Sequence, residues 1–336
     1  MPMEDFEGLL CTHWGHWSEL EMRRLPRVAL QAGQVRLRVR HAGVGHALSL
    51  LVAGKYQRKP PLPFTPGTEV AGEIIEVAPD VDHLAPGQRV MAALDWGGYA
   101  EEAVVTAATV YPVPDVVALA HAAALPITSG TVWAALSWRA RLEPGETLLV
   151  HGAAGALGSA AVQIGRLMGA RVVATASTAA KREAALRLGA EQALPADGQI
   201  LPGAFKDAYP AGADVVFDPV GGDLFDASLR CAGQGARLLT VGYASGRIPQ
   251  VPANILLVKN LSVMGFNYGQ YIGWGLHDER QRHAPRVREA MDAVLAAVVT
   301  GAMLPPAITQ YRFEHWREAV DATMSRRAIG KVILDL

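Results

Sequence analysis

The chain has 336 residues, of which 31 are lysine or arginine and 32 are aspartate or glutamate, so its formal net charge is −1. A chain this close to neutral lacks the basic excess that binds nucleic acid or anionic membranes, and we expect neither as a partner. Its two distant cysteines, Cys11 and Cys231, make neither a disulfide framework nor a cysteine-rich zinc site. We find no signal peptide and no long apolar run, and therefore expect a cytoplasmic protein without a spanning helix.

The first third of the sequence predicts a small β-rich domain. Apolar Val35, Leu37 and Val39 alternate with Gln34, Arg36, Arg38 and Arg40, which predicts a strand with one face in solvent. A loop and a short helix are expected over residues 41–56. Proline- and glycine-rich turns at 59–67, 86–87 and 97–98 each lead into a further strand. Turns at such regular spacing are typical of a compact, barrel-like sheet.

From residue 121 onward the pattern changes to helices and then to alternating strands and helices. Helices are expected over 122–125 and 128–136, strands at 148–150, 171–176, 192–194, 214–218, 236–241 and 261–266, and further helices at 157–168, 181–188 and 223–231. This alternation predicts an α/β fold with a doubly wound parallel sheet. Beyond it we expect helices over 285–299 and 311–320 and a last strand over 330–334, which return to the first domain.

A glycine-rich turn follows the strand at 148–150 and opens the next helix. Its glycines stand at 152, 155 and 158, which is not the standard G-x-G-x-x-G spacing. The order strand, turn, helix, strand nevertheless predicts a nucleotide site, because bare backbone N–H groups and a helix N-terminus hold a pyrophosphate well. The residues expected to line it are Gly152, Ala153, Ala154, Gly155, Ala156, Leu157 and Gly158.

The end of the second strand of this unit indicates which nicotinamide cofactor binds. Enzymes specific for NAD place an acidic residue there to bind the ribose 2′-hydroxyl. Here the chain has Ser177 and Thr178 followed by Lys181 and Arg182. Hydroxyls and cations suit a 2′-phosphate, so NADP(H) is favoured over NAD(H). The alternative is that the two cations are ordinary surface residues of the next helix.

The chain resembles the zinc-free quinone oxidoreductase branch of the medium-chain dehydrogenase/reductase superfamily. The resemblance rests on six segments taken in order, at residues 61–72, 86–90, 123–128, 150–158, 218–222 and 242–254. It implies a GroES-like β-barrel catalytic domain, residues 1–124 and 268–336, around a Rossmann domain over residues 125–267. It also implies hydride transfer from NADPH to a small-molecule substrate, either a quinone or an α,β-unsaturated carbonyl compound.

The resemblance and the residues together indicate a site without metal. Zinc members of the superfamily hold a catalytic ion with thiolate and imidazole, and many add a four-cysteine loop. Neither position has cysteine here, and Gly97 and Gly98 stand where that loop would be inserted. His46 and Glu69 lie near family ligand regions, but a histidine without a cysteine partner is better explained as polar lining.

Two side chains are candidates to donate a hydrogen bond or a proton to the substrate oxygen. Tyr56 matches a family tyrosine that faces the nicotinamide, and its phenol can serve as the donor; the alternative is a core tyrosine. In the preceding loop, Gly45 and Leu48 replace an asparagine and an acid that the family often has. His46 offers an imidazole there instead, unless it is only solvated lining.

The remaining cofactor contacts carry over from the family by position. Thr128 and Thr131 begin a helix expected near the nicotinamide, and most of the others follow the carboxyl ends of parallel strands. These are Val220 and Gly221; Gly242, Tyr243, Ala244 and Ser245; and Phe266 and Asn267. Lys331, on the last strand, is expected to reach a phosphate. For each of them the alternative is ordinary turn chemistry.

Two further functions and one assembly remain open at this point. One function is reduction of a bulky acyl thioester or polyketide-type enone, for which residues 268–282, with Tyr271, Trp274 and His277, would shape or cover the site. The other is NADPH binding with little turnover, in a redox-responsive or structural protein. From the family we also expect a homodimer that pairs through the strand at 261–266, whose apolar side chains suit an edge covered by a partner.

Overall fold

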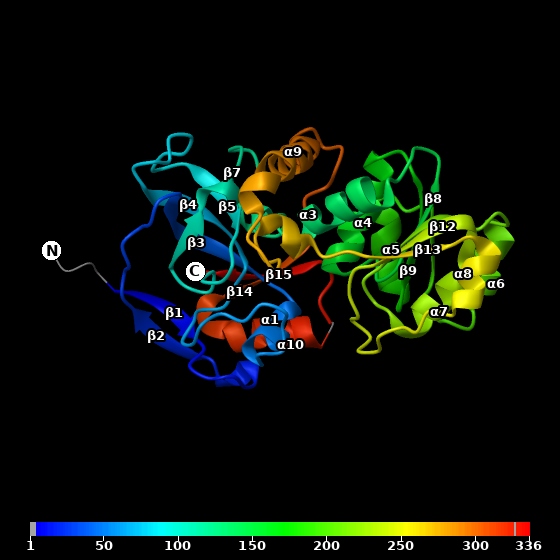
Figure 1. Cartoon of the computed structure of the whole chain (residues 1–336), viewed down its shortest axis with the longest axis horizontal. Helices are drawn as coiled ribbons and strands as arrows, with labels where there is room; N and C mark the ends of the chain where they lie inside the picture. The colour runs from blue at the N-terminus through cyan, green and yellow to red at the C-terminus, as the bar shows by residue number, and fades with distance from the viewer. Residues whose placement is uncertain (1–4, 326) are drawn as a thin grey trace. The chain divides into compact units, whose positions relative to one another are not determined.

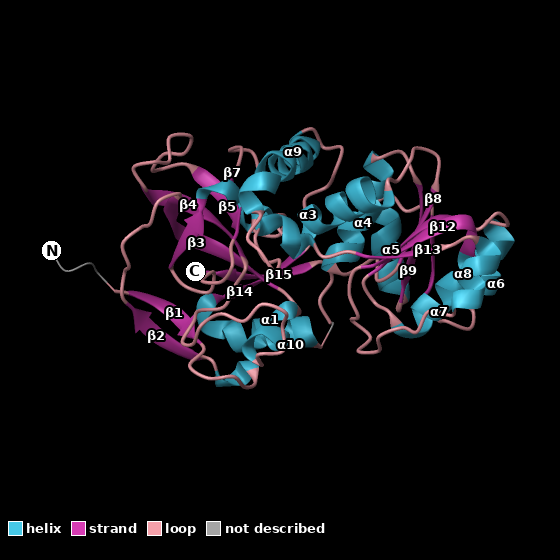
Figure 2. Cartoon of the chain, in the orientation of Figure 1, coloured by secondary structure: helices cyan, strands magenta, loops and turns pink. Residues whose placement is uncertain are grey.

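The computed structural model describes residues 5–325 and 327–336, which fall into two compact units (Figure 1). The first unit takes in the described residues up to 127, together with 269–300 and 305–336. The second unit takes in residues 128–268 and 301–304. The first unit contains two β-sheets as well as helices, whereas in the second unit helices alternate with the strands of one parallel sheet (Figure 2). No helix of the described residues is both long and apolar enough to cross a membrane.

The first unit is built on a seven-stranded sheet in which a long third strand is the central element. The strand order is β14-β15-β3-β4-β5-β7, with β6 also paired to β3. The bounds are β3 Gln34–Val44, β4 Glu69–Val77, β5 Arg89–Ala93, β6 Glu102–Thr106, β7 Val110–Pro112, β14 Ile308–Arg312 and β15 Lys331–Asp335. A separate antiparallel pair consists of β1 Phe6–Leu10 and β2 Glu21–Leu25. Since β3 pairs with three strands, its apolar side chains lie at the centre of this unit's core.

The C-terminal end of the chain completes this sheet. β15 runs antiparallel to β3, with Val332 opposite Val44 and Asp335 opposite His41, and parallel to β14. Its predicted return to the first domain is therefore what the structure shows. The helices of this unit are α1 Ala47–Val52, α2 Leu119–Ala122, α9 Arg280–Val299 and α10 Trp316–Met324, with single turns at η1 Trp17–Glu19, η2 Ala107–Thr109, η4 Tyr268–Ile272 and η5 Phe313–His315.

Several local predictions for this unit were wrong, among them the helix expected over 122–125, which the structure has at residues 119–122. Arg36, expected in solvent, is 2% exposed, because its guanidinium donates to Glu76 and to the Val28 carbonyl. The helix expected over 311–320 begins only at Trp316, because Tyr311 and Arg312 pair with β15. The helix expected from Pro285 begins at Arg280 and contains that proline, since the Asp278 carboxylate accepts the Arg280 N–H at its start.

The second unit contains the predicted parallel sheet. Its order is β10-β9-β8-β11-β12-β13, which in chain order is 3-2-1-4-5-6, the arrangement of a dinucleotide-binding sheet. The strands are β8 Thr147–Val150, β9 Arg171–Ala176, β10 Gln192–Pro195, β11 Ala213–Asp218, β12 Ala232–Thr240 and β13 Ser262–Gly265. The helices are α3 Thr128–Trp133, continued by a π-helical stretch η3 Ala134–Ala140, then α4 Ala156–Leu167, α5 Ala179–Arg187, α6 Leu201–Ala208, α7 Gly222–Cys231 and α8 Ala253–Lys259.

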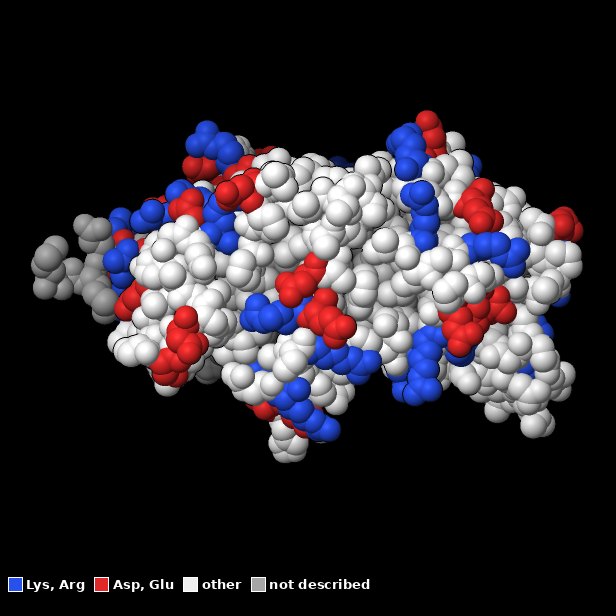
Figure 3. Space-filling model, turned by 90° about the horizontal axis from the view of Figure 1, so that it is seen from above, with Lys and Arg blue, Asp and Glu red and all other residues white. Residues whose placement is uncertain are grey.

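Three neighbouring strands of this sheet, β8, β9 and β11, are buried on both faces, as strands covered by helices must be. All four residues of β8 are buried, as are five of the six in β9 and in β11. The GroES-like and Rossmann-type parts predicted from the sequence are both present. On the face of the molecule drawn in Figure 3, basic and acidic side chains are interspersed over the described residues, as the net charge predicts.

Candidate active site

The glycine turn between β8 and α4 is folded as tightly as its sequence predicts. Gly152 has φ +62°, and the Gly155 N–H donates to the Gly152 carbonyl at 2.9 Å. A Cβ placed on Gly158 would lie 2.1 Å from that same carbonyl oxygen, so only glycine fits there. Gly155 caps α4 without a side-chain acceptor. The first backbone N–H groups of α4 are thus directed outward, where they can bind an anion.

Two other turns at the carboxyl end of the sheet join the glycine turn. A Cβ on Gly152 would lie 3.2 Å from the Val220 side chain, which places the first and second turns side by side. The second and third are hydrogen-bonded: Ser245 N–H donates to the Val220 carbonyl at 2.9 Å, and Ala244 N–H to the Pro219 carbonyl at 3.1 Å. The structure therefore gathers three of the predicted cofactor segments at one edge of the sheet.

Asp218 shapes the second of these turns. Its Oδ1 accepts the backbone N–H groups of Val220 and Gly221 at 2.7 and 2.9 Å, and Gly221 has φ +68°. The Asp218 side chain is therefore committed to the turn and is buried beneath it. The other predicted contacts lie on neighbouring elements. Gly242 follows β12, Phe266 and Asn267 follow β13, and Tyr243 is 43% exposed. Thr128 and Thr131 are buried on α3, which packs against α4.

The end of β9 has the polar character expected for a phosphate. Thr178 caps α5 by accepting the Lys181 N–H at 3.3 Å, and the Arg182 guanidinium donates to the Ala176 carbonyl at 3.3 Å. The Ser177 side chain is exposed. From Arg171 to Arg182 the chain has no acidic residue. This edge therefore presents a hydroxyl and two cationic side chains at the position where a ribose would bind.

In the first unit, the two donor candidates flank helix α1. His46 is exposed and precedes the helix, whereas Tyr56 lies in the turn after it and packs against the core. Burial raises the pKa of Tyr56, and a hydrogen bond with Gln57 opposes this only in part. The phenol is therefore protonated at neutral pH and able to donate. Leu48, where the family often has an acid, is 5% exposed and belongs to the core.

Lys331 is held by a buried ion pair. Its ammonium pairs with Glu69, whose other carboxylate oxygen accepts the Ile127 N–H at 3.2 Å, and both side chains are less than a tenth exposed. A Cβ on Gly45 would lie 3.8 Å from the Lys331 Nζ. The cation thus lies beside the glycine that replaces the family asparagine. The sequence signal for this pair was a charged residue starting each of two apolar strands, Glu69-Val-Ala and Lys331-Val-Ile-Leu.

No group of three or more histidine, cysteine, aspartate or glutamate side chains in the described part of the chain is arranged to hold a metal ion. His46 is exposed beside α1, and Glu69 is paired with Lys331. Cys11 is buried and directs its thiol to the His13 carbonyl at 3.2 Å, while Cys231 is buried in α7. The side chains that would be candidate ligands are therefore engaged elsewhere or lie apart.

Comparison with known proteins agrees with this architecture. Residues 31–115 match the alcohol dehydrogenase GroES-like domain, and residues 156–284 match the zinc-binding dehydrogenase domain. The chain is 37% identical over 337 residues to a quinone oxidoreductase-like protein 2 homolog from Nematostella vectensis, covering 99% of this chain and 89% of the relative. The chain belongs to the quinone oxidoreductase branch of the medium-chain dehydrogenase/reductase superfamily. The family predicted from the sequence is thereby confirmed.

Two further relatives show what the branch includes. The quinone oxidoreductase of Thermus thermophilus, solved alone and in complex with NADPH, superimposes with a TM-score of 0.81 at 32% identity, covering 98% of this chain and all of that one. The polyketide synthase GfsB of Streptomyces halstedii is 37% identical over 305 residues, which is 91% of this chain but 5% of the synthase. Relatives of this chain thus occur both as a separate protein and within a much larger synthase.

Proposed function

We propose that this protein is an NADPH-dependent, zinc-independent oxidoreductase that reduces quinones or α,β-unsaturated carbonyl compounds by hydride transfer. The observation that carries the proposal is the edge of the parallel sheet. There a glycine turn, a helix N-terminus and a strand end with hydroxyl and cationic groups meet at the site where dinucleotides bind. The Thermus relative solved with NADPH supports the same cofactor.

The residues of the second unit fit NADPH. Backbone N–H groups of 152–158 would hold the pyrophosphate, and Ser177 with Lys181 would hold the 2′-phosphate. The nicotinamide half would lie along the turns at Val220–Gly221 and 242–245, the segment Phe266–Asn267, and the buried threonines 128 and 131. When bound, NADPH supplies the hydride. The protein supplies orientation and electrostatics, which is its usual share in cofactor enzymes.

The first unit would supply the charge stabilisation and the proton. Reduction of a quinone or enone by two electrons leaves negative charge on the acceptor oxygen, which must be stabilised and then protonated. Tyr56, whose pKa is raised by burial, would donate from its phenol, and His46 would exchange the proton with solvent. The phosphate contact predicted for Lys331 stays part of the proposal, with its ammonium held by Glu69 beside Gly45.

A second candidate substrate class is favoured by one observation. The match to 305 residues of a polyketide synthase indicates that an acyl thioester enone is an alternative acceptor. The two substrate classes need the same hydride chemistry and differ in the size of the acceptor.

We also propose that the protein is a homodimer joined through the edge strand β13, where Leu257 and Val258 of α8 are exposed nearby.

The proposed activity is tested by following NADPH oxidation with 1,4-benzoquinone, 9,10-phenanthrenequinone and a simple enone, each also with NADH. We expect turnover of at least one acceptor, a preference for NADPH, and no effect of a chelator. Tyr56→Phe should reduce kcat about tenfold to a hundredfold if the phenol donates, within the range of general acid catalysis. Tight NADPH binding without turnover of any acceptor, a short enoyl thioester included, would instead favour the low-turnover binding protein.

A further inference from the structure

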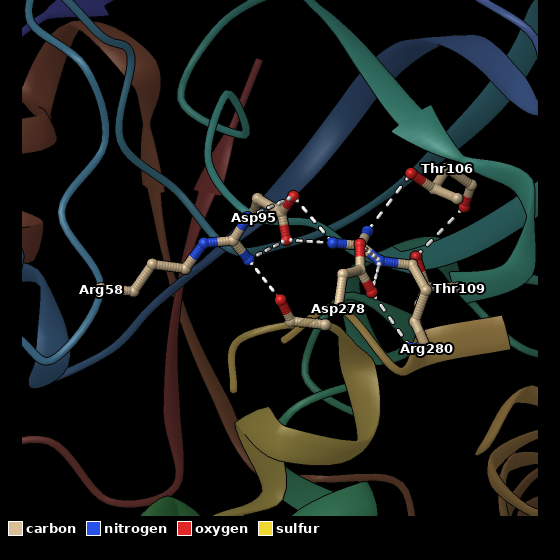
Figure 4. Close-up of polar contacts among 7 residues, drawn as sticks. Arg58, Asp95, Thr106, Thr109, Asp278 and Arg280 are labelled. Carbon is tan, nitrogen blue, oxygen red and sulfur yellow. Dashed lines mark hydrogen bonds and ion pairs between the residues drawn. The ribbon is translucent and has the colours of Figure 1, made fainter. Parts of the chain in front are cut away.

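Asp95 lies at the centre of a charge cluster that joins three distant parts of the first unit (Figure 4). It follows β5, and its carboxylate faces two arginines. Arg58 donates to Oδ1 at 2.9 Å and to Oδ2 at 3.3 Å, while one Nη of Arg280 lies 2.9 Å from both oxygens. The Asp95 side chain is 25% exposed and that of Arg280 only 6%. Removing one partner of such a pair leaves the enclosed charge of the other uncompensated, so both arginines depend on Asp95.

Arg58 connects this cluster to the turn that carries Tyr56. It lies two residues beyond the tyrosine and also donates to the Gly273 carbonyl at 2.7 Å. Its guanidinium stacks over Trp96, 5.2 Å from the ring centre. With a carboxylate, a carbonyl and an aromatic face all engaged, the Arg58 side chain fixes the Tyr56 turn against the segment that contains Gly273.

Arg280 fixes the other end of that segment. Its Nε donates to Asp278 at 2.9 Å and one Nη to the Thr106 hydroxyl at 3.2 Å, so the guanidinium is bound on three sides (Figure 4). Gly273 has φ +93°, and a Cβ there would lie 2.3 Å from the Arg280 guanidinium. The backbone at Gly273 therefore passes directly against the cation, which only glycine allows.

The residues from 269 to 280 are consequently held at Gly273 and at Arg280, both through Asp95. We propose that Asp95 is a positioning residue that holds this segment and the Tyr56 turn in one arrangement, so that together they form a fixed side of the acceptor site. The inference rests on the proposed function, in which Tyr56 faces the acceptor. A larger acceptor reaches both elements at once, so its binding depends more strongly on the cluster.

The test compares Asp95→Asn, which removes the charge, with Asp95→Glu, which keeps it, and with Gly273→Ala, which displaces Arg280 while all charges remain. Steady-state constants are measured with NADPH saturating. For Asp95→Asn and Gly273→Ala we expect KM for 9,10-phenanthrenequinone to rise at least fivefold, KM for 1,4-benzoquinone to rise less, and the Kd of NADPH to stay within twofold. Asp95→Glu should recover part of the loss.

The matched control is Glu314→Gln, which removes the negative charge of an exposed ion pair between Glu314 and Arg312, whose side chains are 66 and 77% exposed. It should leave both KM values unchanged. If Asp95→Asn and Gly273→Ala lower Tm while both KM values stay within twofold of wild type, the cluster is only structural and the inference fails.

A wild-type protein that turns over no acceptor would contradict the proposed function. The positioning role of Asp95 would then be tested by the affinity for the quinone alone. Tryptophan fluorescence quenching gives the Kd of 9,10-phenanthrenequinone without turnover. A Kd at least fivefold weaker in Asp95→Asn than in wild type would still support the positioning role. Equal Kd values, or no saturable quenching of the wild type, would overturn it.

Discussion

His151 lies directly before the glycine turn and is completely enclosed by protein. Its Nδ1 is 2.9 Å from the Thr175 hydroxyl and its Nε2 is 2.6 Å from the Ser228 hydroxyl. Ser228 uses its own proton to donate to the Leu224 carbonyl, so Nε2 donates to Ser228 and Nδ1 accepts from Thr175. This neutral imidazole links β8, β9 and α7 beneath the cofactor edge.

The neutral state of His151 gives the protein a pH-dependent stability. Burial lowers the pKa of His151, and the charge of Asp218 opposes this only in part. A histidine with a lowered folded pKa binds its proton more readily in the unfolded chain. Its contribution to stability is therefore complete above the unfolded pKa, about 6.5, and is lost as the pH falls below it. We expect the unfolding equilibrium constant to rise by up to about tenfold per pH unit below that value.

Urea unfolding between pH 5 and 8 checks this, with His151→Gln and the control His277→Gln, in which an exposed imidazole is replaced. The pH slope below 6.5 should be smaller in His151→Gln and unchanged in the control. Equal slopes in wild type and His151→Gln would show that other groups cause any loss at acid pH.

At the scale of elements, the glycine turn is the segment where the backbone leaves no space for a side chain at Gly158. Gly158→Ala would place a methyl group 2.1 Å from the Gly152 carbonyl oxygen, so the turn or the start of α4 must move. The N–H groups that would hold the pyrophosphate move with it. We expect the Kd of NADPH to rise at least about tenfold, equivalent to ~1.4 kcal/mol.

Cofactor titration measures this loss, and Gly203→Ala is the matched control. Gly203 is an exposed glycine in α6 of the same unit, and a Cβ there meets no atom within 4 Å. That variant should bind NADPH as wild type does. Unchanged affinity in Gly158→Ala, with the fold intact by circular dichroism, would mean that the cofactor does not use this turn.

The elements that could be predicted are those whose signal is local. The apolar run at Leu148–Val150 and the glycines that follow it define a strand and a turn within a dozen residues. Arg36 and Tyr311 could not be placed in this way. Arg36 is buried with its guanidinium bonded to Glu76, and Tyr311 pairs with β15, and both partners are distant in the sequence. The same holds for the candidate site: its turns were predictable, whereas the pairs Glu69–Lys331 and Arg58–Asp95–Arg280 join positions far apart in the chain.

At the scale of the whole molecule, the edge of the second unit's sheet is the feature that needs a partner. β13 pairs with β12 on one side only among the described strands. The Phe266 N–H donates to the Thr240 carbonyl of β12. Successive N–H groups of a strand point to opposite sides, so the N–H group of Val263 points away from β12. Next to it, Leu257 and Val258 of α8 are 79 and 74% exposed. Exposed apolar residues beside an unpaired edge are typical of an interface between two copies of a chain.

We therefore expect the 35.7 kDa chain to elute at twice its mass, and the double variant Leu257→Glu/Val258→Glu to elute as a monomer. Because both side chains are exposed, the carboxylates should not unfold the isolated chain, but they would bring like charges together across a two-fold interface. Size-exclusion chromatography with light scattering measures the mass. The control Leu276→Glu changes a leucine of the first unit that is even more exposed, and this variant should remain a dimer. A wild-type monomer, or a double variant that still dimerises, would show that this edge is not the interface.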